Sequence, residues 1–312
     1  MNFVYKLIFF FIIAQLLGAL VGVLLITKSE LVPEFEDMRV NPIGETGSLW
    51  NAVFFIFYML FGALVFYLII KYYKGVFVFR SIEFMIILFS SNIVFFILLY
   101  SFFPIFGIDW SFIFAFIIAF IFASTKWITH KARNIAAILS SAGVGAIFGF
   151  SLGFWPAILL MICLSVYDYI AVFKTKHMIT FAKALSERNL SFSLQVGNSD
   201  VKITEVNKIN EEKSNIKGNI KEDNYSFKDN KRQKMELGTG DLIMPIMVSV
   251  SSYYVFGLLG TLSVIIGATT AFIVLIYYIL NKKIFLPALP PLTAGCLLGL
   301  GIFYILRLTL GL

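Results

Sequence analysis

Two aspartates in apolar surroundings are the residues best placed to do chemistry. Asp168 is the only charged residue from position 134 to position 173. Asp241 is followed by the run 242–280, which contains no Asp, Glu, Lys, Arg or His. A carboxylate inside a membrane is costly unless it faces a bundle interior or a water-filled cavity, so such acids mark functional sites.

The spacing of these acids favours a pair. They flank one polar segment, residues 174–236. At ~1.5 Å rise per helical residue, Asp168 lies ~9 Å before this segment and Asp241 ~7.5 Å after it. If both helices end at the same membrane surface, the two carboxylates lie at the same depth.

Two kinds of chemistry suit such a pair. Two carboxylates that share one proton can hydrolyse an amide, because the charged one takes a proton from water while the neutral one donates to the carbonyl oxygen. Like charges a few ångströms apart resist joint ionisation, which keeps one acid protonated. The alternative is a proton or cation relay in a transporter. The acids alone leave both functions open.

The composition indicates an all-α polytopic membrane protein. The chain has 312 residues, of which 59% are hydrophobic and 14% charged, and its mean hydropathy is +0.89. Spans of ~20 apolar residues cross a bilayer as helices, which satisfy their own backbone hydrogen bonds. The net charge of +7 does not call for nucleic acid, because 13 of the 25 Lys and Arg residues lie in 174–236. Cys163 and Cys296 lie in apolar runs without CxxC spacing, so they are interpreted as small apolar packing residues rather than metal ligands or a disulfide. The sequence gives no sign of a metal, nucleotide or other cofactor.

We expect nine transmembrane helices in three parts of the chain. Residues 1–173 form a six-helix bundle that ends in the helix of Asp168, 174–236 form a mobile loop, and 237–312 form a three-helix segment. The expected spans are 3–26, 52–70, 82–103, 111–125, two crossings in 134–173 with a break between Gly149 and Pro156, two crossings in 242–280 with a turn between Gly257 and Thr261, and 290–310.

The distribution of basic residues predicts the orientation. Short loops on one side carry nine Lys and Arg residues against three on the other. The positive-inside rule then places the N-terminus and 174–236 in the cytoplasm and the C-terminus outside the cell membrane.

The polar segment 174–236 cannot bury enough apolar surface to fold firmly, so most of it should be mobile. Residues 192–201 alternate around Gly197-Asn198, but an irregular loop is favoured over a weak hairpin. The stretches 233–237 and 285–289 can be extended beside the acids, so we expect an unwound substrate to add to them as a strand. The proline cluster at 287–291 is not expected to be regular helix.

Local spacing accounts for other residues in the spans. Glu83 lies three residues after Arg80, a spacing at which helical side chains meet, and is read as a paired boundary residue rather than a third catalytic acid. Gly145, Gly149 and Gly153 recur every four residues, which favours close helix packing.

The sequence contains three short motifs in this order: Tyr167-Asp168, Gly238-Thr239-Gly240-Asp241 and Pro287-Ala288-Leu289. Together they resemble the presenilin and signal peptide peptidase family of intramembrane aspartyl proteases. The resemblance implies that Asp168 and Asp241 are the catalytic pair. It implies supporting or substrate-binding roles for Tyr167, Gly238, Thr239, Gly240, Pro287, Ala288 and Leu289.

The family resemblance also sets the expected partners. Substrates would be transmembrane-helix proteins in the lipid bilayer, with no nucleic acid, and the enzyme could form a homo-oligomer. The Gly-x-Gly-Asp pattern continues into Pro245, which resembles the signal peptide peptidase branch. The membrane orientation predicted from the basic residues is that of presenilin, and a prokaryotic presenilin homologue fits best.

Overall fold

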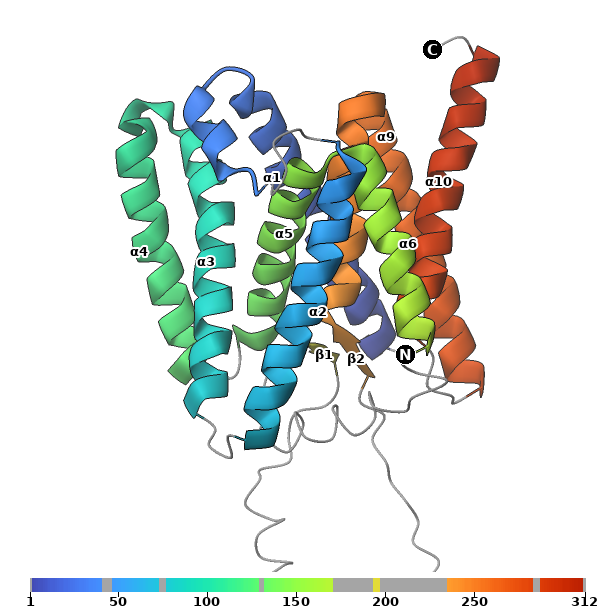
Figure 1. Cartoon of the computed structure of the whole chain (residues 1–312), viewed down its shortest axis with the longest axis horizontal. Helices are drawn as coiled ribbons and strands as arrows, with labels where there is room; N and C mark the ends of the chain where they lie inside the picture. The colour runs from blue at the N-terminus through green and yellow to red at the C-terminus, as the bar shows by residue number, and fades with distance from the viewer. Residues whose placement is uncertain are drawn as a thin grey trace, which may run out of the picture.

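The computed structural model describes residues 2–40, 47–72, 77–128, 132–170, 193–196, 235–282 and 287–310. This part of the chain is a helical bundle with a two-stranded sheet at one end (Figure 1). Its elements are α1 (Asn2–Ser29), η1 (Pro33–Met38), α2 (Leu49–Tyr72), α3 (Phe77–Phe102), η2 (Pro104–Phe106), α4 (Gly107–Ile128), α5 (Arg133–Leu152), α6 (Phe154–Ile170), β1 (Ser193–Val196), β2 (Met235–Gly238), α9 (Thr239–Lys282) and α10 (Leu289–Leu310).

The described part of the chain contains nine apolar helical segments. Six helices are long and apolar enough to cross a membrane, and two shorter apolar helices lie in α2 and α6. The 44-residue α9 counts twice, because Gly257 breaks it with φ 63° and ψ −157°, a conformation that glycine adopts without steric cost. Gly153, with φ 73°, separates α5 from α6. The predicted nine-helix fold and both predicted breaks are confirmed.

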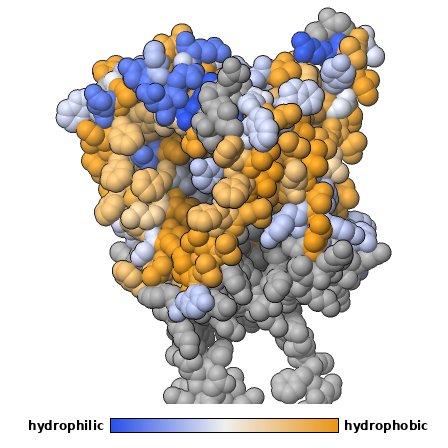
Figure 2. All heavy atoms as spheres, viewed as in Figure 1, coloured by the Kyte–Doolittle hydropathy of each residue, from blue (hydrophilic) through white to orange (hydrophobic). Residues whose placement is uncertain are grey.

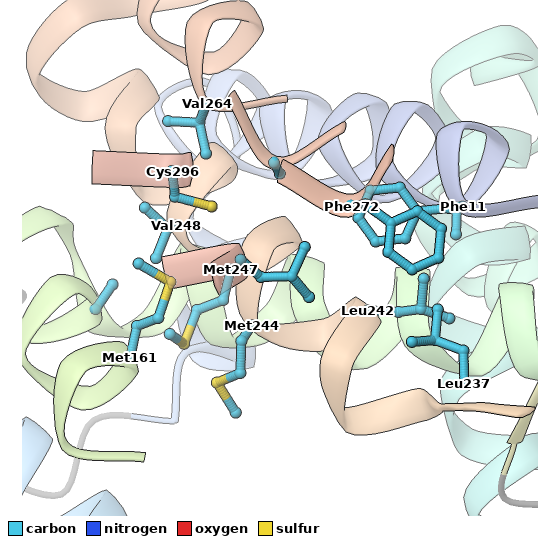
Figure 3. Packing of buried hydrophobic residues seen from close by; sticks show 14 of the residues in the cluster. Phe11, Met161, Leu237, Leu242, Met244, Met247, Val248, Val264, Phe272 and Cys296 are labelled. Carbon is cyan, nitrogen blue, oxygen red and sulfur yellow. The ribbon is translucent and has the colours of Figure 1, made fainter. Parts of the chain in front are cut away.

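The bundle is built around α9, which packs against α1, α5, α6 and α10. The rings of Phe11 and Phe272 stack with centroids 4.2 Å apart where α1 meets the second half of α9. Figure 3 shows this stack beside the buried Leu242, which follows Asp241 in sequence. By contrast, α2 packs chiefly against α6, and α4 chiefly against α3.

Four residues of the polar segment form a strand, contrary to the irregular loop favoured from the sequence. Ser193–Val196 pairs antiparallel with Met235–Gly238, with Ser193 opposite Gly238 and Val196 opposite Met235. The extended conformation expected close to Asp241 is confirmed for β2, which leads directly into α9. The other residues of the loop expected to be mobile lie outside the described ranges, apart from Met235 and Glu236.

The partner of Glu83 differs from the one that local spacing suggested. Glu83 of α3 forms a buried ion pair with Lys126 of α4, and both side chains are 8% exposed. The spacing rule considers only one helix, whereas the close packing of α3 and α4 brings a cation 43 residues away to the carboxylate. Lys126 therefore belongs inside α4, which extends beyond the predicted 111–125 at both ends.

The end of the bundle distant from the sheet is hydrophilic (Figure 2). The N-terminus of α1 lies at the end that carries β1 and β2, and α10 finishes at the opposite end (Figure 1). Figure 2 shows a largely hydrophobic lateral surface, with hydrophilic residues gathered at the end distant from the sheet. There the segment after α1 is held by buried Phe35 and by a 3.0 Å hydrogen bond from the Val40 N–H to Ser151 Oγ. The chain thus has the apolar flanks and polar end of a membrane-spanning bundle.

Candidate active site

Asp168 points into the bundle from the last turn of α6. Its side chain is 8% exposed, whereas Tyr167 and Tyr169 on either side are 53% and 55% exposed. Neighbouring residues on a helix face different directions, so burying the carboxylate turns both rings outward. Tyr167, expected to support the site, therefore lies on the exposed side of α6.

Asp241 occupies the first turn of α9, immediately after β2. Its carboxylate accepts a hydrogen bond from the backbone N–H of Gly238. With Thr239 as the first helical residue, Gly238 is the N-cap and Asp241 the third residue, so the acid reaches back as in one half of a capping box. A Cβ on Gly238 would lie 3.4 Å from Asp241 Oδ2. The Gly-Thr-Gly-Asp motif thus closes the helix end with the functional acid itself.

Asp168 and Asp241 come together where α6 packs against α9, close enough for their charges to repel each other. Asp168 accepts a hydrogen bond from the backbone N–H of Leu289. Asp168 Oδ2 is buried and has no hydrogen-bond partner among the described residues. The structure therefore brings the two acids together, and among the described residues one of their oxygens has an unused hydrogen-bonding capacity.

The proline-rich motif meets the acids through the start of α10. Pro287 is buried, and Ala288 and Leu289 pack against the main core cluster. The expectation that residues 287–291 lie outside regular helix is wrong for Leu289, Pro290 and Pro291, which form the first turn of α10. Proline is tolerated there because the first N–H groups of a helix have no partner within it. This placement leaves the Leu289 N–H free to reach Asp168.

The remaining residues of the glycine motif differ in their surroundings. Thr239 is half-buried and Gly240 is exposed. A Cβ on Gly240 would meet nothing within 4 Å. Packing among the described residues therefore does not require glycine there.

A family model described as signal-peptide peptidase, presenilin aspartyl protease matches residues 7–309. The chain belongs to this family. It is therefore an intramembrane aspartyl protease and a multi-pass integral membrane protein, and the relay alternative loses its support. No curated protein matches the sequence closely enough to count as a relative.

Solved structures of presenilin-family proteases have the same fold. One presenilin family intramembrane aspartate protease, in a C222 crystal, is 24% identical, covers 96% of this chain and 99% of its own, and superposes with a TM-score of 0.62. A second structure with that description, in a P2 crystal, is 25% identical, covers 94% of this chain and 96% of its own, and gives a TM-score of 0.58. The likeness extends over nearly the whole length of both chains.

In this presenilin-family chain, glycines of two helices clasp the first half of α9. Gly18 and Gly22 of α1 and Gly145 and Gly149 of α5 contact α9 so closely that a Cβ on any of them would clash. A Cβ on Gly145 would lie 2.6 Å from Ile246, and one on Gly149 would lie 2.6 Å from the Met247 carbonyl oxygen. The packing role predicted for Gly145 and Gly149 is confirmed. The clasp holds the helix that carries Asp241.

One residue near the site was missed by the sequence reading. Gln15 of α1 is fully buried and donates from Nε2 to the carbonyl oxygen of Leu242 at 3.3 Å. The available signal was a lone amide within the long apolar run of α1. Among the described residues, no group of three or more His, Cys, Asp and Glu could hold a metal ion.

Proposed function

We propose that Asp168 and Asp241 form the catalytic dyad of this protease and hydrolyse peptide bonds of unwound transmembrane helices. The observation that carries the proposal is the approach of the two carboxylates, with backbone N–H donors holding Asp168 from Leu289 and Asp241 from Gly238. Donors from fixed main chain orient both acids without relying on flexible side chains.

In the proposed reaction, the charged carboxylate takes a proton from water as the water oxygen attacks the scissile carbonyl carbon. The protonated carboxyl gives its proton to the carbonyl oxygen, which yields a tetrahedral diol. The acid that gained a proton then donates it to the amide nitrogen, and the other recovers one from a hydroxyl as the C–N bond breaks. The products are a carboxylic acid and an amine, and the dyad returns to its starting protonation. The Asp168 Oδ2 atom, which has no partner among the described residues, supports this role, since it can accept from water or donate to substrate.

The substrate must lose helical hydrogen bonds before water can reach its carbonyl carbon. Each unpaired backbone group in lipid costs ~2–7 kcal/mol, so the enzyme must supply replacement partners. Among the described residues, β2 pairs only with β1, and it leads directly to Asp241, so its second edge is a suitable partner for substrate. We infer that unwound substrate pairs with β2, with the main chain supplying affinity and little side-chain specificity. Residues 285 and 286 of the second candidate stretch lie outside the described ranges.

The proposal extends to supporting residues and topology. We infer that Thr239, Gly240 and the Pro287-Ala288-Leu289 segment border the bound substrate. We also infer that residues 1–173 and residues 237–312 each contribute one aspartate to the active site. The count of basic residues supports a cytoplasmic N-terminus and a cytoplasmic 174–236 loop in the cell membrane.

The test uses purified full-length protein in detergent with a single-span substrate, and mass spectrometry of the products. Asp168→Asn and Asp241→Asn should each abolish cleavage while preserving the thermal stability of the bundle. Robust product formation by either variant would contradict the dyad. Proton-coupled flux without peptide products would instead support the relay.

A further inference from the structure

Gln15 is a buried polar side chain that the proposed chemistry does not use. It lies in the membrane-spanning α1 with no exposed surface, and its Nε2 donates to the Leu242 carbonyl oxygen. Its Oε1 is buried without a hydrogen-bond partner among the described residues. A half-satisfied amide inside a membrane bundle weakens the fold rather than strengthening it. Its one hydrogen bond therefore needs another reason.

The packing of α1 against α9 places this hydrogen bond beside the dyad. Gly18 contacts Ile246 and Gly22 contacts Val250, with no room for a Cβ on either glycine. Both helices start at the sheet end of the bundle, so they run in the same direction (Figure 1). About one helical turn before Gly18 and Ile246, Gln15 of α1 contacts Leu242 of α9. The two glycines bring the backbones close enough for the amide to reach the residue that follows Asp241.

The first turn of α9 is short of internal hydrogen bonds. Pro245 has no N–H, so the carbonyl of Asp241 lacks the donor that lies four residues later in an ordinary helix. A carbonyl oxygen has two acceptor sites, so Leu242 can take the Gln15 N–H in addition to its helical donor. Gln15 thus supplies a hydrogen bond from a neighbouring helix in the turn where the proline has removed one.

We propose that Gln15 is a positioning residue for Asp241. Its hydrogen bond fixes the backbone at Leu242 and so sets the direction from which the Asp241 carboxylate faces Asp168. This role rests on the proposed function, because it requires Asp241 to act in catalysis. The glycine clasp sets how closely α1 and α9 approach, and Gln15 sets the orientation of the turn beyond it.

The test is Gln15→Leu, which removes the donor and the unpartnered oxygen and keeps a similar volume. Because a displacement near 1 Å at the reacting groups can cost ~100-fold in rate, we expect kcat to fall at least ~10-fold with KM changed by less than ~2-fold. Thermal stability in detergent should equal or exceed that of the parent, since an unpartnered polar atom is removed. A residue that served only the fold would instead lower stability when replaced.

Asn92→Leu is the matched control, because Asn92 of α3 is also a buried amide with an unpartnered oxygen. Its kcat should match that of the parent. Parental kcat in Gln15→Leu, a fall that accompanies a loss of stability, or an equal fall in Asn92→Leu would overturn the positioning role. Asp241→Asn in the same assay separates the two claims: an inactive Asp241→Asn beside a fully active Gln15→Leu contradicts only the role of Gln15, whereas an active Asp241→Asn contradicts the dyad.

Discussion

The backbone N–H of Leu289, the first residue of α10, donates to the carboxylate of Asp168 on α6. The next two residues, Pro290 and Pro291, have no N–H to offer. The first N–H groups of a helix have no partner within it and carry the positive end of the helix dipole. The motif therefore leaves one donor at this helix end and directs it to an acid of the site.

Replacing Leu289 with proline removes this N–H donor and should leave the fold intact, so it tests the donor alone. A hydrogen bond to a charged group contributes ~1.5–3 kcal/mol, so Leu289→Pro should lower kcat/KM by at least ~10-fold. Proline is tolerated in a first helical turn, so the bundle should remain folded. Leu289→Ala keeps the N–H and is the control, expected to cleave nearly at the parental rate. Parental cleavage by a folded Leu289→Pro protein would refute the role of this donor.

Gly240 offers a test of where the substrate passes next to Asp241. In the described part of the chain, no atom lies within 4 Å of a Cβ placed on this residue. Alanine or valine there should leave thermal stability unchanged or slightly higher, because glycine costs a helix ~0.5–1 kcal/mol relative to alanine. Cleavage should fall progressively from glycine to alanine to valine if substrate backbone occupies that space. An unchanged rate with valine would show that substrate passes elsewhere.

Gly149 tests the clasp around α9. The Cβ of Gly149→Ala would lie 2.6 Å from the backbone oxygen of Met247, which cannot move without shifting the helix. Overpacking of this kind costs ~1–3 kcal/mol, so the melting temperature in detergent should fall. Gly301→Ala in α10, where a Cβ meets no described residue within 4 Å, should not lower it. Equal melting temperatures for the two variants would argue against a tight α5–α9 contact.

The buried pair of Glu83 and Lys126 should matter for stability and not for chemistry. Because removing one partner leaves a buried charge, Glu83→Gln should destabilise the bundle by ~3–5 kcal/mol. Arg80→Gln at the exposed Arg80 should have a much smaller effect. Denaturation of the two variants in detergent compares them directly. A larger loss from Arg80→Gln would favour the pairing expected from local spacing.

Features with a local cause were predictable from the sequence. The breaks at Gly153 and Gly257 lie within the predicted ranges 149–156 and 257–261, because each long apolar run has to turn and glycine allows the backbone angles of a turn. The similar depth of Asp168 and Asp241 followed from helix rise and from their distances to one polar segment.

Features that depend on contacts between distant segments were not predictable. The four residues of β1 pair with β2 about 40 positions later, and a strand this short has too weak a pattern to reveal its partner. Lys126 pairs with Glu83 because α4 packs against α3. A spacing rule that considers one helix cannot predict a contact between two helices. Gln15 reaches Leu242 only because Gly18 and Gly22 let α1 approach α9.

The measurement that tests the central claim most directly is the single-turnover cleavage rate of a single-span substrate by the parent, Asp168→Asn, Asp241→Asn and the double variant. Asp109→Asn, which replaces an exposed acid in the first turn of α4, is the control and should cleave at the parental rate. Groups that act as one catalytic unit lose nearly all activity when either is removed. We expect both single variants to fall to the rate of the double variant, with all three correctly folded. A single variant that cleaves well above the double variant would contradict a shared Asp168–Asp241 dyad.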